Sequence, residues 1–567
     1  MRARPSGVDV RPGGFAGASG MNAIRLALAG GAFWLVGAMV FFRQSWASRL
    51  DVVTGDLGDG RLITFLHEHL YDWLRGAAAF RSPDYFHPQR LTLGFTDSFL
   101  LDVLPYSLFR SLGADAYLAM LLLDVSLSLM CFAAAAVVLL RYFRVTPLIA
   151  FAAALLITFP NNLFFKASIG HLNFFGLYWV PVIGLLALWA FDGFPRPTRW
   201  SYLRGFVAGL LYALLFSSAY YVAWLFALTL LIAAICAGVI ALRRGAIAID
   251  RRGGVALAGL SAVAAAGFVI GLSSFVYIYG PVLAIFPGRS FADYLAFAPH
   301  PIDLLNVSRH NLMWGSLVRE MVGPVVSDDG ERGLAVTPIL LLAFVGFSTG
   351  LLRRDPAAAA SRPRWEALFV WASLGVFVLS WLLTVQVGGT SAFALLYKTI
   401  PGAVAIRTGG RIQLLVNLWV VCGLALALDR WIAAARPDAR LKRVVPAGLL
   451  LALCAAEQLN RNRSVLTRSG QRALLASMPP APADCRSFFI DRPTDLRLFQ
   501  FDALAIAQAT GLPTLNGSSG VFPPDWGFWN YDAGYLPAVQ RWIDAHRLTG
   551  VCSYDQTDRR WRVRVRD

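Results

Sequence analysis

Charged residues are scarce in this sequence. Only 15% of its 567 residues are Asp, Glu, Lys or Arg, whereas soluble globular proteins average about 25%. Hydrophobic residues make up 57% of the chain, and long apolar runs recur throughout, which is typical of a helical membrane protein with many spans. The scarcity of charge therefore excludes a soluble protein of ordinary composition.

Several common signatures are also absent. The region after about residue 458 contains no P-loop, no G-x-S-x-G and no zinc-ligand spacing. Residues 26–42 are too long and too hydrophobic for a signal peptide and lack a convincing cleavage site, so they are predicted to be a first membrane span. No standard motif identifies the chemistry of the C-terminal region.

Cysteine is rare, with six residues in the whole chain. Those that fall in predicted spans, where a small apolar residue is the plain interpretation, are Cys131, Cys236, Cys422 and Cys454. Cys485 and Cys552 fall in a predicted outer domain, where an oxidising compartment permits a disulfide. Pairing needs Cα atoms within about 7 Å, so the sequence leaves this disulfide open.

Apolar segments recur eleven times, and a bilayer is crossed by about 20 residues. They lie near 24–42, 116–140, 147–160, 175–191, 202–217, 222–242, 254–279, 335–352, 366–385, 411–429 and 444–457. The sequence therefore predicts an all-α polytopic membrane domain over residues 23–457 with about 11 transmembrane helices. A small α/β domain is predicted over residues 458–567.

Basic residues cluster on alternate connections between these spans. The clusters are Arg2/Arg4/Arg11, Arg141/Arg144, Arg196/Arg199/Arg204, Arg243/Arg244/Arg251/Arg252, Arg353/Arg354/Arg362/Arg364 and Arg436/Arg440/Lys442/Arg443. All fall on one side of the membrane if the N-terminus is cytoplasmic, as the positive-inside rule requires. The net charge of +17 is thus explained by membrane orientation, and no nucleic-acid partner is expected. Residues 1–22 are predicted to be a disordered cytoplasmic tail, or an over-extended start with Met21 as the true one.

The long connections then lie outside, together with the C-terminal domain. The predicted outer loops are 43–115, 161–174, 280–334 and 386–410. In the C-terminal domain the pattern predicts a strand at 487–491, helices at 504–510 and 536–546, and a hairpin formed by 550–554 and 561–566. The loop at 513–526 either binds a sugar or serves ordinary core and turn chemistry.

A cluster of charge follows the first span. The stretch Asp51-Val-Val-Thr-Gly-Asp56-Leu-Gly-Asp59-Gly-Arg61 holds three carboxylates, three glycines and an arginine. The glycines allow backbone shapes that point two carboxylates into one pocket, and general acid–base catalysis uses such carboxylates. Asp56 is the first candidate for catalysis and Asp59 the second, with Arg61 as a candidate for substrate binding. The alternatives are a solvated or calcium-like acidic turn, or a helix N-cap at Asp59.

Residues 61–75 have the spacing of an amphipathic helix. Apolar residues from Leu62 to Leu74 share one face, and polar residues from His67 to Arg75 share the other. The pattern predicts a helix lying at the membrane surface. His67 and His69 do not indicate a metal pair, because residues two apart on a helix face different directions.

Other polar residues of the outer loops are candidates for binding substrate. Asp84, His87 and Asp97 follow in the first outer loop, where solvated loop residues or helix caps are equally good interpretations. His171 lies at the start of a span as a candidate partner for a phosphate or carboxylate. The alternative for His171 is an interfacial histidine with a backbone partner.

Two arginines stand on the outer side, against the positive-inside trend. Arg407 and Arg411 lie beside glycines at the mouth of a span. Arginine can hold a phosphate through two parallel hydrogen bonds, so these residues are predicted to bind an anionic head group. The alternative is an interfacial arginine whose charged end reaches out to water.

The overall pattern resembles the GT-C superfamily of membrane glycosyltransferases, in an uncharacterised bacterial branch. The resemblance rests on the cytoplasmic N-terminus, the many spans, the long first outer loop with Asp56 and Asp59, and the terminal outer domain. The stretches Pro401-Gly…Arg407…Arg411 and Pro513-Thr-Leu-Asn-Gly-Ser-Ser-Gly also look like stretches of such proteins.

The resemblance implies transfer of a sugar from a polyprenyl-phosphate donor, with inversion, to an envelope glycan, lipid or protein on the outer face of the bacterial cytoplasmic membrane. Asp56 would deprotonate the acceptor or, with Asp59, hold a divalent cation such as Mg or Mn. Arg407, Arg411 or His171 would stabilise the departing lipid phosphate. The rival interpretations are a flippase for a lipid-linked saccharide, for which Asp124 inside a predicted span is the support, and a non-catalytic subunit of envelope assembly.

Overall fold

The computed structural model describes residues 20–243, 250–286, 288–325, 329–353 and 364–565. Within these ranges nine helical segments are long and apolar enough to cross a membrane. They are formed by α1 (Gly20–Phe41), α5 (Ala116–Val137), α6 (Pro147–Thr158) with α7 (Asn161–Ser168), α8 (Trp179–Ala190), α9 (Arg199–Ser218), α10 (Tyr220–Arg243), α11 (Arg251–Ile285), α16 (Arg364–Thr384) and α18 (Gln413–Ala433). The shorter helices α15 (Pro338–Leu352) and α19 (Leu441–Ala456) occupy the two remaining predicted spans. Helices thus form at all eleven predicted positions.

The α18 helix is the centre of the bundle, since its side chains are almost all buried against α6, α10, α15 and α16. The outer helices instead leave large apolar side chains uncovered, as at Leu231 and Leu242 of α10. An apolar surface on this scale suits lipid rather than water. Glycines bring α9 and α11 together, because a Cβ at Gly209 or Gly267 would lie about 2 Å from a backbone oxygen of the facing helix.

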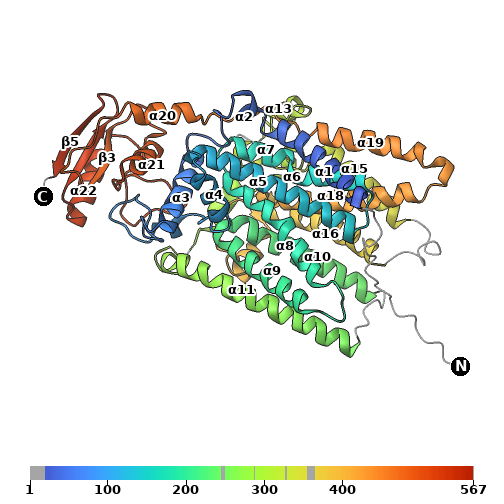
Figure 1. Cartoon of the computed structure of the whole chain (residues 1–567). Coiled ribbons are helices and arrows are strands. Elements are labelled where there is room, and N and C mark those ends of the chain that lie inside the picture. Colours follow the sequence, from blue (N-terminus) through green and yellow to red (C-terminus); the bar gives the residue numbers. More distant parts are fainter. Residues whose placement is uncertain (1–19, 244–249, 287, 326–328, 354–363, 566–567) are drawn as a thin grey trace.

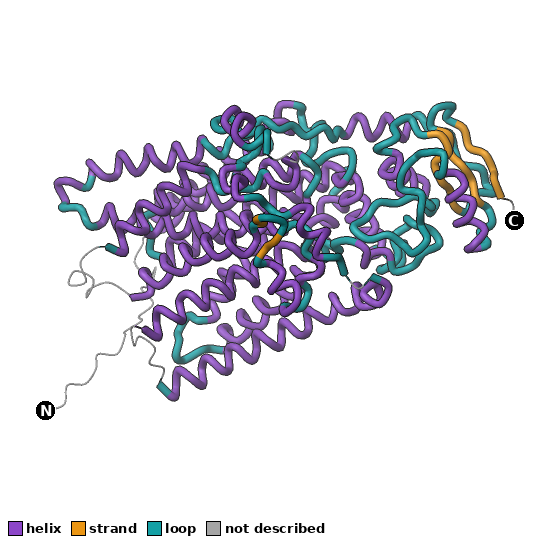
Figure 2. The backbone as a smooth tube through the Cα atoms, turned by 180° about the vertical axis from the view of Figure 1, so that it is seen from behind, coloured by secondary structure: helices purple, strands orange, loops and turns teal. Residues whose placement is uncertain are grey.

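The bundle has two different ends. In Figure 1 the C-terminal sheet lies at one end, and α21 (Phe499–Thr510) lies between this sheet and α3 (Asp59–Leu74), next to α4 (Val103–Ser111). The α19 helix and the beginning of α1 extend toward the other end. Figure 2 shows from behind that loops and strands gather at the sheet end. Among the predicted basic residues, Arg2, Arg4, Arg11, Arg244, Arg354 and Arg362 lie outside the described residues, as does most of the predicted tail, whose last residues begin α1. The side of the membrane that each end faces stays a prediction.

The outer loops contain short elements of their own. The first loop adds α2 (Arg43–Ala47) and the 3₁₀ helix η1 (Thr92–Phe95). The loop before α15 holds α12 (Phe291–Phe297), η4 (Pro301–Leu305), α13 (Gly315–Met321) and α14 (Asp329–Arg332). The loop before α18 holds β1 (Gln386–Val387), β2 (Thr390–Ser391), α17 (Phe393–Thr399), η6 (Ala403–Ala405) and η7 (Gly409–Ile412), and η3 (Leu172–Tyr178) leads into α8.

The predicted membrane-surface helix is wrong in its placement. The α3 helix begins at Asp59 rather than at residue 61, and every side chain from Arg61 to Leu70 is buried. It packs against α4, α5 and α21 (Phe499–Thr510), so protein covers the face that the sequence assigned to water. Glu68 on that face pairs with Arg110 and accepts a hydrogen bond from Tyr106. A buried carboxylate needs such partners to offset its lost hydration.

The C-terminal domain is a three-stranded sheet with helices, close to its prediction. Strands β3 (Ser487–Arg492), β4 (Val551–Asp555) and β5 (Arg560–Val565) run in that order, with β3 and β4 parallel and β4 and β5 forming the predicted hairpin. The α21 helix starts five residues earlier than predicted, α22 (Tyr535–His546) starts one residue earlier, and α20 (Arg468–Ala476) was not predicted. The structure forms the Cys485–Cys552 disulfide, with the Cα atoms 5.6 Å apart.

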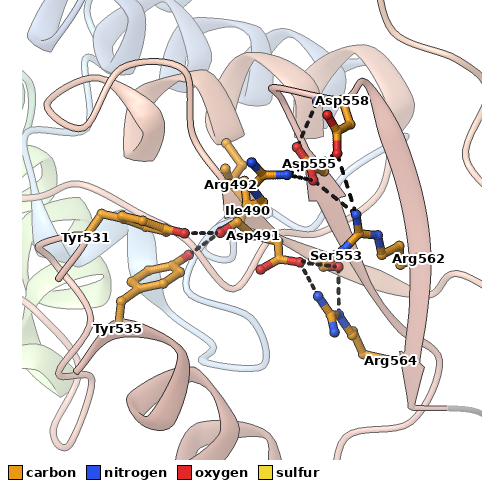
Figure 3. Close-up of polar contacts among 10 residues, drawn as sticks. All are labelled: Ile490, Asp491, Arg492, Tyr531, Tyr535, Ser553, Asp555, Asp558, Arg562 and Arg564. Atoms are coloured by element: carbon orange, nitrogen blue, oxygen red, sulfur yellow. Dashed lines mark hydrogen bonds and ion pairs between the residues drawn. The ribbon is translucent and has the colours of Figure 1, made fainter. Parts of the chain in front are cut away.

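Acids and arginines form a cluster on this sheet, shown in Figure 3. We call it the sheet network. Its members are Asp491, Arg492, Asp555, Asp558, Arg562 and Arg564. Beside it, the Tyr531 and Tyr535 hydroxyls donate to the backbone carbonyls of Asp491 and Ile490 at 2.6 and 2.7 Å.

Hydrogen bonds join the C-terminal domain to the first outer loop. The His87 N–H donates to the Thr514 carbonyl at 2.9 Å, and the Trp542 indole donates to the His87 carbonyl at 2.8 Å. Asn516 is fully buried and bonds Gln500 and Tyr535, so the loop at 513–526 contributes to the core here. The first loop is therefore held by the domain that follows the last span.

Candidate functional site

Asp56 organises the acidic loop. One of its carboxylate oxygens accepts hydrogen bonds from the N–H groups of Gly58 and Gly60, at 3.0 and 3.1 Å, at the start of α3. Gly170 lies so close that a Cβ there would be 2.2 Å from the Asp56 carboxylate, and its φ of +93° also favours glycine. Burial raises the pKa of Asp56, while the two backbone N–H groups act in the opposite direction. The capping role that the sequence allowed for Asp59 thus belongs to Asp56.

Asp59 is the first residue of α3 and its carboxylate is free to meet a ligand, since 43% of its side chain is exposed. Its surroundings are nonetheless rich in protein and in charge. Burial, together with the nearby Asp56 and Glu331 carboxylates, raises the pKa of Asp59 to about 6, although Arg411 and Lys166 act to lower it. A carboxyl group with a pKa near neutrality is suited to accept a proton.

His171 stands between two carboxylates. Its Nδ1 lies 3.5 Å from Oδ2 of Asp59, and its Nε2 lies 3.6 Å from Oε1 of Glu331. Burial and the nearby Lys166 and Arg411 cations lower its pKa well below the ordinary value, against the opposing effect of Glu331. The imidazole links the acidic loop to the segment that carries Glu331.

Glu331, on α14, is surrounded by cations. Nε and Nη2 of Arg411 reach its two oxygens at 2.8–3.1 Å. The Lys166 ammonium lies 3.3 Å from Oε2, and Nη2 of Arg407 lies 4.0 Å from Oε1. Burial acts to raise the pKa of Glu331, but Arg411, Lys166 and His171 outweigh it and hold the pKa well below the usual range. We call Glu331 and these four residues the Glu331 cluster.

Aromatic rings support the two arginines. The Arg411 guanidinium lies over the rings of Phe174 and Tyr221, 5.1 and 4.7 Å from their centroids. The Arg407 guanidinium lies 4.5 Å from the Phe297 centroid. Aromatic faces attract cations, so both guanidinium groups are held by contacts that do not involve a carboxylate.

The members of the cluster are ordered by depth. Lys166 is fully buried, Arg411 and Glu331 are nearly so, and Arg407 keeps 35% of its side chain exposed. A ligand arriving from solvent would meet Asp59 and Arg407 first and the deeper cations afterwards. Acids and bases that are brought together in this way, with displaced pKa values, are typical of functional sites.

Five of the predicted site residues therefore meet: Asp56, Asp59, His171, Arg407 and Arg411. They come from three different outer loops. A sixth, Asp97, lies close behind, where its carboxylate accepts hydrogen bonds from Asn173 at 2.9 Å and from the N–H of Tyr220 at 3.0 Å, at the start of α10. Its role in the structure is to join the first loop to two spans.

The other three predicted site residues lie elsewhere, toward the C-terminal domain. Arg61 is buried, donates to Gln471 at 2.9 Å and pairs with Asp502 of α21. Asp84 and His87 belong to the segment that pairs with Thr514. These residues attach the first loop to the domain rather than to the Glu331 cluster.

Sequence reasoning missed Glu331 and Lys166. Glu331 follows Asp329 and Gly330 in a long loop with no diagnostic spacing, and Lys166 reads as one polar residue among several. The available signal was the pair of outer arginines, since buried cations require a carboxylate partner. Which carboxylate pairs with these arginines depends on which loops, far apart in sequence, come together in the fold.

The fit of a divalent cation rests on two carboxylates. Asp56 and Asp59 were predicted to hold such an ion, and Asp56 is already engaged by backbone N–H groups. Among the residues that the structure describes, no three His, Cys, Asp or Glu side chains gather in positions that could hold a metal ion. Magnesium is often bound through one or two carboxylates plus substrate phosphates, so a cation here would need ligands from the substrate.

Solved structures share this architecture. The oligosaccharyltransferase of Archaeoglobus fulgidus in its apo form matches 93% of this chain and 69% of its own, with a TM-score of 0.53 and 12% sequence identity. The same protein with Zn and sulfate matches over 92% and 68%, with a TM-score of 0.50 and 12% identity. The chain has the GT-C fold.

A further similarity to the GT-C fold is weaker. The arabinofuranosyltransferase AftD from Mycobacteria gives a TM-score of 0.49 and 15% identity over 88% of this chain, which spans 32% of AftD. No protein-family model and no curated protein matches the sequence. The similarity therefore concerns the fold, and it confirms the fold that the sequence predicts. The chemistry depends on the residues of the site.

Proposed function

We propose that the chain is an inverting glycosyltransferase that moves a sugar from a polyprenyl-phosphate donor to an acceptor hydroxyl on the outer face of the bacterial cytoplasmic membrane. The observation that carries this proposal is the meeting of an exposed carboxylate, Asp59, with the cations Lys166, Arg407 and Arg411. The GT-C fold supports a sugar transfer. The acceptor would be an envelope glycan, lipid or protein.

Asp59 is the better base of the two acids. Asp56 faces Gly170 and caps α3, which leaves little room for an acceptor. The Asp59 side chain is partly exposed, and its pKa, raised to about 6, leaves it ionised at neutral pH and still able to accept a proton. Base catalysis works best when the pKa of the base lies near the working pH. Asp56 then positions the loop that carries the base.

The cations suit the other half of the reaction. A polyprenyl-phosphate leaving group gains negative charge as its bond to the sugar breaks, and preorganised positive groups stabilise that charge most when water is excluded. Arg411 and Lys166 are buried and already positioned, and Arg407 stands at the exposed edge. The three cations can therefore stabilise the negative charge of one phosphate group.

The proposed step balances as follows. The acceptor oxygen forms a bond to the anomeric carbon while the bond from that carbon to the phosphate oxygen breaks. The acceptor proton passes to Asp59, and the bonding electron pair leaves with the lipid phosphate. Attack opposite to the leaving group inverts the anomeric configuration. A divalent cation held by Asp56 and Asp59 would add positive charge near the phosphate.

The transporter hypothesis has less structural support than the glycosyltransferase. Asp124, the acid inside a span, accepts a hydrogen bond from Thr54 of the first outer loop. It lies only two turns into α5, on the side of the outer loops. An ion or proton pathway would place ionisable groups facing one another at mid-membrane, whereas Asp124 anchors the acidic loop.

The test is a transfer assay with purified protein in proteoliposomes, radiolabelled polyprenyl-phosphate sugars and envelope acceptors. Transfer by the wild type should fall by about 10²-fold or more in Asp59→Asn, the effect of losing a general base. Asp84→Asn is the matched control, since Asp84 is an exposed acid of the same loop. Equal transfer by the wild type and Asp59→Asn would contradict the proposal. Movement of lipid-linked sugar between leaflets without transfer would indicate a flippase instead.

A further inference from the structure

Glu331 occupies the position that a phosphate would need. Its two oxygens take the Arg411 donors, Nε and Nη2, that would otherwise hold a phosphate in a two-pronged grip. Lys166 approaches one of these oxygens, and His171 and Arg407 approach the other. A carboxylate and a phosphate compete for the same geometry on a guanidinium.

Several cations converge on Glu331. Among the described residues, Lys166, Arg407 and Arg411 approach its carboxylate, and Arg411 and Lys166 also act on the nearby Asp59. A phosphate offers more acceptor oxygens than a carboxylate, so this convergence of donors suits a phosphate as well as it suits Glu331. The aromatic contacts of Arg407 and Arg411 would also keep both guanidinium groups in place if Glu331 left.

Glu331 is carried on a small element. The α14 helix comprises Asp329–Arg332, a single turn. Lys166 donates to the Gly330 carbonyl and to the Glu331 carboxylate, which belong to adjacent residues of this turn. Withdrawal of Glu331 would thus require the shift of one turn and no change in the spans.

We propose that Glu331 is an internal competitor for the phosphate seat, which fills the seat in the resting protein and yields it to the phosphate of a polyprenyl phosphate. This inference rests on the proposed function and names a residue that sets the affinity for the donor. Competition of this kind weakens donor binding and, after transfer, helps to expel the spent lipid phosphate. It also gives Arg411 a buried partner when no lipid is bound.

The test measures binding of farnesyl phosphate to the full chain in detergent, in phosphate-free buffer, by calorimetry. Glu331→Gln keeps an oxygen that accepts from Arg411 but removes the competing charge, so it should bind farnesyl phosphate roughly tenfold more tightly than the wild type. Farnesol, which lacks the phosphate, should bind both proteins alike. Equal or weaker binding of farnesyl phosphate by Glu331→Gln would overturn the proposal, as would equal tightening with farnesol.

Two variants make the result specific. Glu320→Gln is the matched control, because Glu320 is an exposed carboxylate of the same outer loop, and its affinity should equal that of the wild type. If Glu331→Gln does not fold, Glu331→Asp retracts the carboxylate by one methylene and should bind more tightly than the wild type by a smaller factor; no tightening would overturn the proposal.

The binding assay needs no sugar transfer, so its outcome separates two failures. Tighter binding without any transfer activity would support the phosphate site and contradict the proposed enzymatic function. Transfer with unchanged binding in Glu331→Gln would do the reverse. In an active protein, Glu331→Gln should lower KM for the donor and also lower kcat, because the lipid phosphate leaves more slowly.

Discussion

Two clusters of arginine and carboxylate residues in this protein look alike in composition and differ in setting. The Glu331 cluster draws its members from three outer loops, and its central pair, Glu331 and Arg411, is almost fully buried. The sheet network draws its members from β3, β4, β5 and the turn before β5. Its arginines stay 40–51% exposed (Figure 3), although its acids Asp491 and Asp555 are buried.

The difference lies in how each charge is compensated. In the sheet network acids and arginines are matched in number, and Arg492 is shared by Asp555 and Asp558 at 3.4 and 3.0 Å. In the Glu331 cluster Lys166, Arg407 and Arg411 converge on one described carboxylate, with Asp59 nearby. Charge pairs that are screened by water contribute little, whereas buried charges are expensive unless satisfied. The arginine of the central pair is buried in the Glu331 cluster, whereas the arginines of the sheet network reach water.

The largest expected effect is the loss of Arg411. Arg411→Ala leaves the buried Glu331 carboxylate without its closest partner, and breaking a buried pair costs about 3–5 kcal/mol of unfolding free energy. Thermal unfolding in detergent should show a clear drop in midpoint. The double variant Arg411→Ala/Glu331→Gln should recover part of it, since the uncompensated charge is gone. A single variant as stable as the wild type would remove the distinction between the two clusters.

Covalent support separates the clusters further. The Cys485–Cys552 disulfide closes a loop with a sequence separation of 67 beside the sheet network. Replacing both cysteines by serine should cost the C-terminal domain about 4 kcal/mol through the freedom gained by its unfolded chain. Limited proteolysis of the domain measures this cost. Cys236→Ser, at a free cysteine of α10, is the control and should leave cleavage unchanged.

A pH profile tests the acid at the edge of the Glu331 cluster. Asp59 must be ionised to accept a proton, and its pKa is about 6. Transfer should therefore fall about tenfold per pH unit below 6 and level off above it. Initial rates at saturating donor, with unfolding checked at each pH, provide the measurement. A rate that stays constant from pH 7 to pH 5 would exclude Asp59 as the base.

The smallest effect is expected in the sheet network. Arg492→Ala removes a half-exposed arginine whose partner Asp555 is also approached by Arg562 at 3.3 Å. Asp555 is buried but keeps Arg562 and the Asp558 N–H as partners, so the cost should be about 1 kcal/mol of unfolding free energy. Sugar transfer should be unchanged. A loss comparable to that of Arg411→Ala would show that exposure does not govern these pairs.

Local features of this protein were predictable because their causes are local. A span requires about 20 apolar residues in a row, so all eleven helices could be located from the sequence. The strands β3 and β4 follow from short runs between turn residues, and β5 follows from the alternation of arginine with Trp561, Val563 and Val565. The α3 helix shows the limit, because its pattern defines two faces and does not say that α21 covers one of them.

The candidate site was predictable in part. Asp59 stood out in the acidic stretch after the first span, and His171 and Arg411 stood out at the starts of later spans. The structure brings all three together. Arg61 stood out in the same way and turns instead to Asp502 of the C-terminal domain. The spacing of these residues does not tell which of them join the Glu331 cluster and which pair with the C-terminal domain. That depends on which loop each of them faces.

The sequence by itself determined the membrane class, the positions of the helices and the gathering of acids and arginines in the outer loops. The tertiary structure alone decided which acid is exposed and which is a cap, because that depends on the approach of Gly170 to Asp56. It also decided that Glu331 meets Arg411, 80 residues away. Loops on one side of a membrane can meet in many combinations, and only the packing of the spans beneath them selects one.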